Sequence, residues 1–329
     1  MPTPRTLTVA AIQPQSRNFD IAGNLQRAEA LVEIAAQRGA ELVLCPELLA
    51  AGYIYDPRIW DVAEPRGGPT ETWLVRMARR YRLYIGASYL EAEGDDFYNT
   101  FTLMKPDGFA AGRVRKQSLP GFEGWFSRSC SGHKVIETEL GRIGVGICHD
   151  NNLACFMRGL ERARVDLLLM PHSGPCIAMG PLKLVGEPGR ELLRGVAGFY
   201  AQALGIPTVM ANKAAGEDSP SPIPWVPLLR FNFHFVGQSS ICDGGGNVCE
   251  QLDEGEGVAV SQVVLDPQKK RAPERKDSGY WVGAAPFLPD FPRISAALFQ
   301  MLEGMGRIAY TLSESRRAAA RKAQYSRAR

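Results

Sequence analysis

The amino-acid sequence predicts a layered α/β fold built on mixed β-sheets. Short apolar runs alternate along the chain with segments whose apolar residues recur at helical spacing, as at Leu25, Ala28, Leu31, Val32 and Ala35. Strand pairs joined by tight turns interrupt this alternation, for example around the Pro-Asp-Gly sequence at 106–108. Alternating helices and strands favour parallel strand pairs, whereas hairpins add antiparallel ones. We therefore expect helices to cover a sheet, or sheets, that contain both kinds of pairing.

Each predicted strand is a short run of mainly apolar residues, and each predicted helix shows apolar residues at a period near 3.6. The strands are expected at 7–13, 41–47, 83–90, 98–108, 110–116, 134–148 (a hairpin turning near Leu140), 165–171, 207–213, 237–243 and 257–266. The helices are expected at 24–38, from 70 or 72 to 81, and at 154–163, 190–204 and 292–313. Two long segments, 172–189 and 215–235, show neither pattern and are expected to be loops, which often carry function.

Size, charge and cysteine usage narrow the class of protein. The chain has 329 residues and a formal net charge of +3, with 45% hydrophobic and 22% charged residues. This is the composition of an ordinary globular protein, and its charge gives no reason to expect a nucleic-acid partner. No apolar run reaches the roughly 18 residues needed to span a bilayer, and the first residues lack a signal-peptide core. The seven cysteines contain no CxxC pair. We expect a cytoplasmic protein with reduced thiols, no membrane partner and no metal site.

Three predicted strands end in a chemically active side chain: Glu47, Lys116 and Cys148. Each alone has an ordinary explanation, as a solvated carboxylate, a surface charge or a small buried residue. Together they suit acyl transfer from an amide-like carbonyl. A cysteine attacks as its thiolate, a carboxylate can take the thiol proton, and an ammonium group can stabilise the oxyanion that forms.

Three segments resemble the signature segments of the nitrilase, or carbon–nitrogen hydrolase, superfamily. They are "LVLCPELLAAGY", "GRVRKQSLPGFEGWF" and "RIGVGICHD". They contain a Glu, a Lys and a Cys in the order typical of that family, and the resemblance extends from about residue 6 to about residue 270. It implies a four-layer α-β-β-α sandwich of the nitrilase-like type, and it implies that neither a metal nor an organic cofactor is needed.

The resemblance also implies roles for individual residues. Glu47 would be the general base, Lys116 the oxyanion-stabilising cation and Cys148 the nucleophile. The "EGW" at 123–125 is similar to the form found in aliphatic amidases. By that similarity Glu123 would hold Lys116 and position the substrate. The alternative for Glu123 is a solvated loop carboxylate.

Five further residues are candidate substrate contacts. After the cysteine, many family members have an aromatic and then an acidic residue, whereas this chain has His149 and Asp150. His149 could tune the thiolate or contact substrate, or its backbone alone could matter. His172 and Ser173 follow the strand at 165–171, and His172 could equally be a structural histidine. The other two candidates are aromatic, with core packing as their alternative, namely Tyr53 and Trp125.

We expect a hydrolase of a small amide that works through a thioester acyl-enzyme. An N-carbamoyl amine or amino-acid hydrolase, a nitrilase and an amide-forming acyltransferase remain alternatives, and a non-catalytic partner-binding protein is the alternative of a different class. Residues 1–290 would form the hydrolase domain. Residues 291–329 would form a helix and a basic tail at the interface of a homodimer or larger homo-oligomer, an assembly that the resemblance implies.

Overall fold

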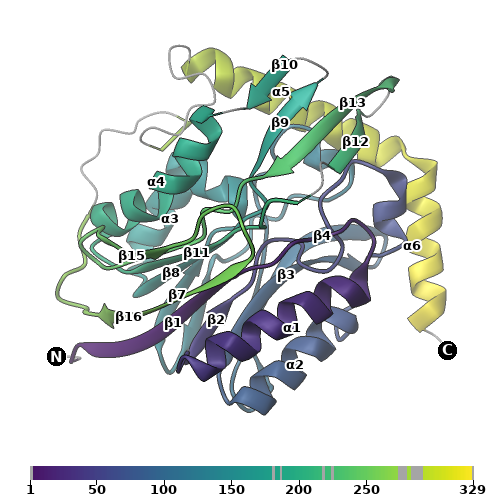
Figure 1. The fold of residues 1–329 in the computed structure, drawn as a ribbon. Helices are drawn as coiled ribbons and strands as arrows, with labels where there is room; N and C mark the ends of the chain where they lie inside the picture. Colours follow the sequence, from purple (N-terminus) through teal and green to yellow (C-terminus); the bar gives the residue numbers. More distant parts are fainter. Residues whose placement is uncertain are drawn as a thin grey trace.

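The computed structural model describes residues 3–179, 182–185, 187–216, 219–223, 226–272, 280–282 and 292–327. Two six-stranded mixed sheets pack face to face, with helices on their outer faces (Figure 1). The first sheet has the order β16 (Gly257–Leu265), β1 (Arg5–Gln13), β2 (Leu42–Leu44), β3 (Tyr84–Glu93), β4 (Asp96–Met104), β5 (Ala110–Arg115). The second has the order β15 (Val248–Gln251), β14 (Ser240–Cys242), β11 (Thr208–Ala211), β8 (Leu167–Pro171), β7 (Gly141–Val145), β6 (Val135–Thr138).

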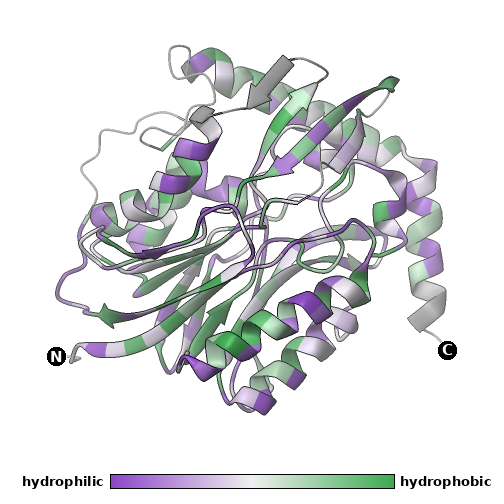
Figure 2. Cartoon of the chain, viewed as in Figure 1, coloured by the Kyte–Doolittle hydropathy of each residue, from purple (hydrophilic) through white to green (hydrophobic). Residues whose placement is uncertain are grey.

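The layers follow from strands that are apolar on both faces. In β1, Leu7, Val9 and Ala11 enter the core between the sheets, whereas Ala10 and Ile12 face the helices. The first sheet is covered by α1 (Ile21–Gln37) and α2 (Pro69–Tyr81), and the second by α3 (Ala154–Ala163) and α4 (Glu187–Leu204). Figure 2 shows that apolar residues follow the strands, while α1 and α2 carry polar residues on their exposed sides. The predicted α-β-β-α sandwich is therefore confirmed.

The two segments expected to be loops contain regular structure, so that expectation was wrong. Their described parts form a third, four-stranded sheet with the order β10 (Leu182–Val185), β9 (Pro175–Met179), β13 (Val226–Phe235), β12 (Ser219–Ile223). Pro220 and Pro222 lie in β12, at the edge of this sheet, where a strand can tolerate prolines. The signal that was overlooked is the alternation of Phe231, Phe233 and Phe235 with polar residues in β13. In addition, α4 begins at Glu187 rather than near residue 190.

The C-terminal region forms two helices rather than one helix and a tail. These are α5 (Pro292–Leu312) and α6 (Glu314–Arg327), drawn in yellow-green and yellow in Figure 1. α5 lies across the short 3-10 helix η2 (Glu123–Trp125), which carries one of the candidate site residues. The predicted domain boundary at 290/291 lies outside the described residues, and the interface role of this region stays a prediction. No helix in the described ranges is long and apolar enough to cross a membrane.

Candidate active site

The three strand-end residues converge between the two sheets. Glu47 lies three residues beyond β2, Lys116 directly follows β5, and Cys148 begins the 3-10 helix η3 (Cys148–Asn152) after β7. Glu47 and Lys116 are fully buried, whereas Cys148 retains partial access to solvent. The backbone holds two of them in place, because Glu47 N donates to His172 O at 3.1 Å and Lys116 N donates to Asn99 O at 2.9 Å.

Lys116 joins two buried carboxylates. Its Nζ lies 2.6 Å from Glu47 Oε1 and 2.6 Å from Glu123 Oε2. The amide of Asn99 in β4 bridges the same pair, donating to Glu47 Oε1 at 2.8 Å and to Glu123 Oε1 at 3.2 Å. Glu47 Oε2 is buried and has no hydrogen-bond partner among the described residues. One oxygen of Glu47 is thus held in place while the other is available for a proton.

Sharing one lysine separates the acidities of the two glutamates. Burial by itself would raise the pKa of Glu47, but the charge and hydrogen bond of Lys116 hold it below its usual value. Burial raises the pKa of Glu123 to about 7, and the charge of Glu47 adds to this increase. Burial opposes the charged form of Lys116, but the two carboxylates outweigh it and hold its pKa well above normal. At neutral pH, Glu47 is therefore an ionised base beside an ammonium group.

Cys148 sits on a strained turn. Its φ of +49° lies in the left-handed region, which costs a non-glycine residue about 1–3 kcal/mol. Burial and the charge of Glu47 raise the pKa of its thiol, against the opposing effects of Lys116 and the backbone N–H of Ser173. The resting side chain is thus a thiol that needs a base.

The turn that carries Cys148 is held by Asn151, whose Nδ2 donates to Gly146 O at 2.8 Å and to Cys148 O at 3.1 Å. Position 146 must be glycine for Asn151 to lie here, because a Cβ at Gly146 would be only 2.0 Å from Asn151 Oδ1.

The structure brings His172 and Ser173 to the site, where both contact protein groups. Ser173 Oγ donates to Glu47 O at 2.7 Å, and His172 Nε2 lies 3.0 Å from Asn151 Nδ2. Burial lowers the pKa of His172 to about 4, so its ring is neutral. This placement agrees with the alternative interpretation of His172 as a hydrogen-bonded structural histidine, and its role as a substrate contact stays a prediction. Both residues brace the segments that carry the base and the nucleophile.

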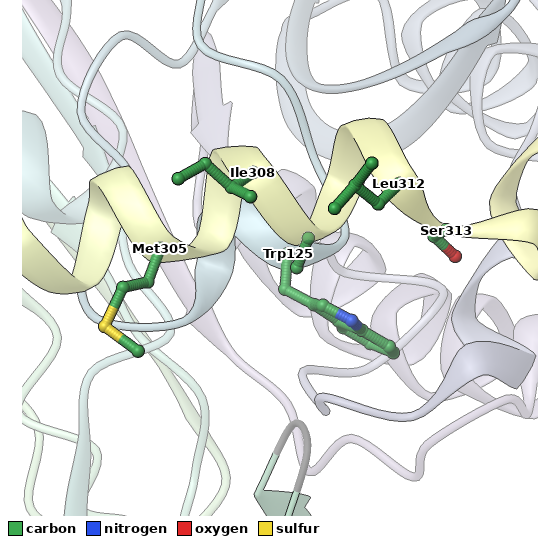
Figure 3. Close-up of a pocket in the computed structure, with 6 residues that line it drawn as sticks. Trp125, Met305, Ile308, Leu312 and Ser313 are labelled. Atoms are coloured by element: carbon green, nitrogen blue, oxygen red, sulfur yellow. The ribbon is translucent and has the colours of Figure 1, made fainter.

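Tyr53 belongs to the cluster, whereas Trp125 does not. Tyr53 Oη donates to Glu123 Oε2 at 3.0 Å. Trp125 packs against Trp60, with ring centroids 4.9 Å apart, and lies beside α5 (Figure 3). η2 thus directs Glu123 inward and Trp125 into aromatic packing, which agrees with the alternative interpretation of Trp125, and its role as a substrate contact stays a prediction.

His149 also differs from one of its expected roles. Its ring stacks on Phe299 of α5 at 5.2 Å and meets Trp281 edge-on at 5.7 Å. Burial lowers its pKa to about 3, so the imidazole is neutral and cannot supply a charge that activates the thiol. The interpretation that its backbone is the functional part agrees with this packing.

Two residues of the site were missed in the sequence. Asn99 is a fully buried polar residue of β4, and Ser88 Oγ orients its amide by donating to Asn99 Oδ1 at 2.8 Å. Lys213 is fully buried, and its Nζ donates to Leu48 O at 3.3 Å. Burial lowers the pKa of Lys213 to about 7, an effect that Glu47 partly opposes. Lys213 ends the predicted strand at 207–213, so the strand-end signal that identified Lys116 applies to it as well.

The cluster has the parts required for covalent acyl transfer. It places a thiol, an ionised carboxylate and an ammonium group in one buried site. The described residues contain no group of three or more His, Cys, Asp or Glu side chains that could hold a metal ion. All seven cysteines are free thiols.

Comparisons with known proteins agree with this chemistry. The family model described as carbon-nitrogen hydrolase matches residues 8–269. N-carbamoylputrescine amidase from Solanum tuberosum is 27% identical over 276 residues, which cover 81% of this chain and 89% of that protein. Citrullinase from Francisella tularensis is 29% identical over 228 residues, covering 64% and 75%. The solved amidase from Nesterenkonia sp. AN1 shares the fold, with a TM-score of 0.63 at 20% identity over 79% of this chain and 92% of that chain.

Proposed function

We propose that this chain, which belongs to the carbon–nitrogen hydrolase family, hydrolyses a small amide through a thioester on Cys148. The family and its amidase relatives make it a hydrolase of amide-type carbon–nitrogen bonds. The observation that carries the residue assignment is the asymmetry of Glu47. Its Oε1 is held by Lys116 and Asn99, and its buried Oε2 has no partner among the described residues. A carboxylate held in this way is oriented to exchange a proton.

In the first half-reaction, the Cys148 sulfur attacks the amide carbon as Glu47 takes the thiol proton. Electrons from the carbonyl double bond move onto its oxygen, and Lys116 and the backbone N–H of His149 stabilise the oxyanion. When the carbonyl re-forms, the carbon–nitrogen bond breaks and Glu47 gives its proton to the departing nitrogen. Ammonia or an amine leaves, and the acyl group remains on sulfur as a thioester.

In the second half-reaction, water takes the place of the amine. Glu47 removes a proton from the water as the water oxygen attacks the thioester carbon. Collapse of the oxyanion breaks the carbon–sulfur bond, the proton returns to sulfur, and the carboxylic acid leaves. Glu123 holds Lys116 throughout, and Tyr53 and Asn99 keep Glu123 in place by donating to its two oxygens.

An N-carbamoyl amine or amino acid is the second candidate substrate class. The names of two relatives, N-carbamoylputrescine amidase and citrullinase, favour it. The same thiol, base and cation would act on a ureido carbonyl, leaving a carbamoyl thioester for water to cleave. The choice between the two classes depends on the groups that surround the acyl and amine parts of the substrate.

We also propose that the protein works in the cytoplasm as a homo-oligomer. The seven free cysteines support a reducing compartment, where thiols stay unpaired. Exposed apolar side chains on α5, such as Ile308 and Leu312, support association of the chain.

The test is ammonia release from matched simple amides, N-carbamoyl compounds and nitriles. Cys148→Ala is expected to abolish turnover, whereas Cys155→Ala, which removes an exposed thiol outside the cluster, is expected to retain it. Mass spectrometry after rapid quenching should find the acyl adduct on the peptide that contains Cys148. Turnover by Cys148→Ala at the wild-type rate would refute the assignment of the nucleophile.

A further inference from the structure

Lys213 is a fully buried lysine beside the active site that has no acidic partner among the described residues. Within those residues its Nζ donates one hydrogen bond, to Leu48 O at 3.3 Å, and it lies 5.3 Å from the ring centre of Phe235. Lys116 is also fully buried, but its Nζ pairs with two carboxylates at 2.6 Å. An ammonium group has three donors, so Lys213 has bonding capacity that the described part of the chain does not use.

The protein holds Lys213 next to the segment that carries the candidate base. Its carbonyl oxygen accepts from Gly237 N at 3.0 Å, which fixes the backbone. Its Nζ is bound to Leu48, the residue directly after Glu47. The amine therefore lies at the site because both ends of the residue are held there.

The strand ends place Lys213 two strands away from Cys148. β7, β8 and β11 are neighbouring parallel strands, so their carboxyl ends lie at one edge of the second sheet (Figure 1). Cys148 lies three residues beyond β7, and Lys213 lies two residues beyond β11. Adjacent strands are about 4.8 Å apart, which gives about 10 Å between the two strand ends. Burial lowers the pKa of Lys213 to about 7 against the opposing charges of Glu47 and Cys148, so both groups lie within electrostatic reach.

A buried cation without a counter-charge destabilises the folded protein, because the ammonium group has lost its water. His172 directly follows β8, between the two strand ends, but its neutral ring supplies no negative charge. An anion bound beside Lys213 would supply that charge and favour the protonated amine. The substrate is the component of this site that can bring one.

We propose that Lys213 binds a carboxylate of the substrate while the reacting carbonyl lies at Cys148. This inference rests on the proposed function, because it names the substrate class of the same site. The Lys213 ammonium group donates to the carboxylate, and Leu48 O keeps the bond that it already accepts. The cysteine and lysine side chains occupy part of the distance between their strand ends, which leaves room for a spacer of about two or three methylene groups.

The carboxylate can be carried on either side of the carbon–nitrogen bond. On the acyl side, the substrate is the monoamide of a dicarboxylic acid, and the acyl group stays anchored through both half-reactions. On the nitrogen side, the substrate is an N-carbamoyl amino acid, and the anchored group leaves with the amine. A substrate whose distal group is cationic would be repelled by the Lys213 ammonium group.

The test compares carboxylates with neutral groups of the same shape. Succinamate is paired with 4-methylpentanamide, and 3-ureidopropionate with (3-methylbutyl)urea, so that an isopropyl group replaces the carboxylate in each pair. The wild-type protein should have the higher kcat/KM for the carboxylate of at least one pair, which also identifies the side that carries it. Lys213→Met should lower this preference, the ratio of the two kcat/KM values, about 10- to 150-fold, as expected for the loss of a charge-assisted hydrogen bond.

Lys134→Met is the matched control. The Nζ of Lys134 also donates to backbone carbonyl groups, those of Arg115 and Cys130, and burial also lowers its pKa. Its replacement should leave the preference for the carboxylate unchanged. The preference is a ratio measured on one protein sample, so a partly unfolded variant does not alter it.

Three kinetic outcomes would overturn the assignment. They are a wild-type preference for the neutral compounds or for the cationic 4-aminobutanamide, an unchanged preference in Lys213→Met, and an equal loss of preference in Lys134→Met. Absence of hydrolysis for every compound would count against the proposed function. Calorimetry on Cys148→Ala then decides the role of Lys213 separately. Adding Lys213→Met should weaken binding of the carboxylate about 10- to 150-fold, whereas absent or unchanged binding would overturn the assignment.

Discussion

Replacing Glu123 with Gln is expected to move activity and stability in opposite directions. The substitution keeps the shape of a fully buried side chain and removes its charge. Glu123 accepts hydrogen bonds from Lys116 at 2.6 Å and Tyr53 at 3.0 Å. The Glu123 carboxylate therefore holds the Lys116 ammonium group in place. Burial of its charge near Glu47 destabilises the fold.

The stability effect follows from the raised pKa of Glu123, about 7 against an ordinary 4.5. Between these two pH values the folded chain binds more protons than the unfolded chain, so the free energy of unfolding falls as pH rises. At 1.36 kcal/mol per pKa unit, the wild-type protein loses about 3 kcal/mol by pH 8. Glu123→Gln cannot titrate, and its stability relative to the wild type should grow by this amount between pH 4.5 and 8.

The activity effect follows from the lost charge-assisted hydrogen bond to Lys116. Such a bond contributes about 1.5–3 kcal/mol. If Lys116 is held less firmly in the transition state, kcat/KM should fall about 10- to 150-fold. The assays are urea unfolding at pH 5 and pH 8, and initial rates on the best amide substrate.

Glu64→Gln is the matched control. Glu64 is also buried with its pKa raised to about 7 by burial, and it accepts hydrogen bonds from Thr70 outside the active-site cluster. Its substitution should show the same pH-dependent gain in stability with full activity. Wild-type kcat/KM in Glu123→Gln would refute the reasoning about Lys116. A stability difference that does not grow with pH, when that of Glu64→Gln does, would refute the charge argument.

Three other substitutions test separate parts of the structure. Burial lowers the pKa of Lys213 from 10.5 to about 7. Between pH 7 and pH 10.5 the unfolded chain therefore binds a proton on this lysine that the folded chain lacks, and the free energy of unfolding rises with pH. Lys213→Met should abolish that rise and add on the order of 3 kcal/mol at pH 7, and an unchanged slope in urea unfolding would contradict this. Glu47→Gln should lower kcat/KM by about 10²–10⁴-fold and should also lower Tm, because it leaves the buried Lys116 with one carboxylate fewer. Near-normal rates would exclude Glu47 as the base. Gly306→Ala should lower Tm and kcat because the new methyl group would meet the backbone of Gly124 at 3.0 Å. Gly195→Ala, with nothing within 4 Å of its Cβ, should instead add about 1 kcal/mol, and equal effects of the two would argue against the packing role.

The sandwich could be predicted because its information is local. The residues of β1 alternate between the inter-sheet core and the helix-covered face, and both sets are apolar in the sequence itself. The third sheet could not be predicted in the same way. β13 pairs with β9, which is distant in sequence, as Phe233 does with Ile177, and the prolines of the edge strand β12 resemble those of a loop.

The sequence by itself determined the layered fold, the family resemblance and the identity of the thiol, carboxylate and lysine at three strand ends. Each depends on residue type, spacing and order, which a linear pattern contains. The tertiary structure alone decided that Asn99 bridges two glutamates, that Lys213 is buried beside Glu47, and that Trp125 packs away from the site. The physical reason is that burial, hydrogen-bond geometry and acidity depend on neighbours distant in the chain, which come together only when the sheets close on one another.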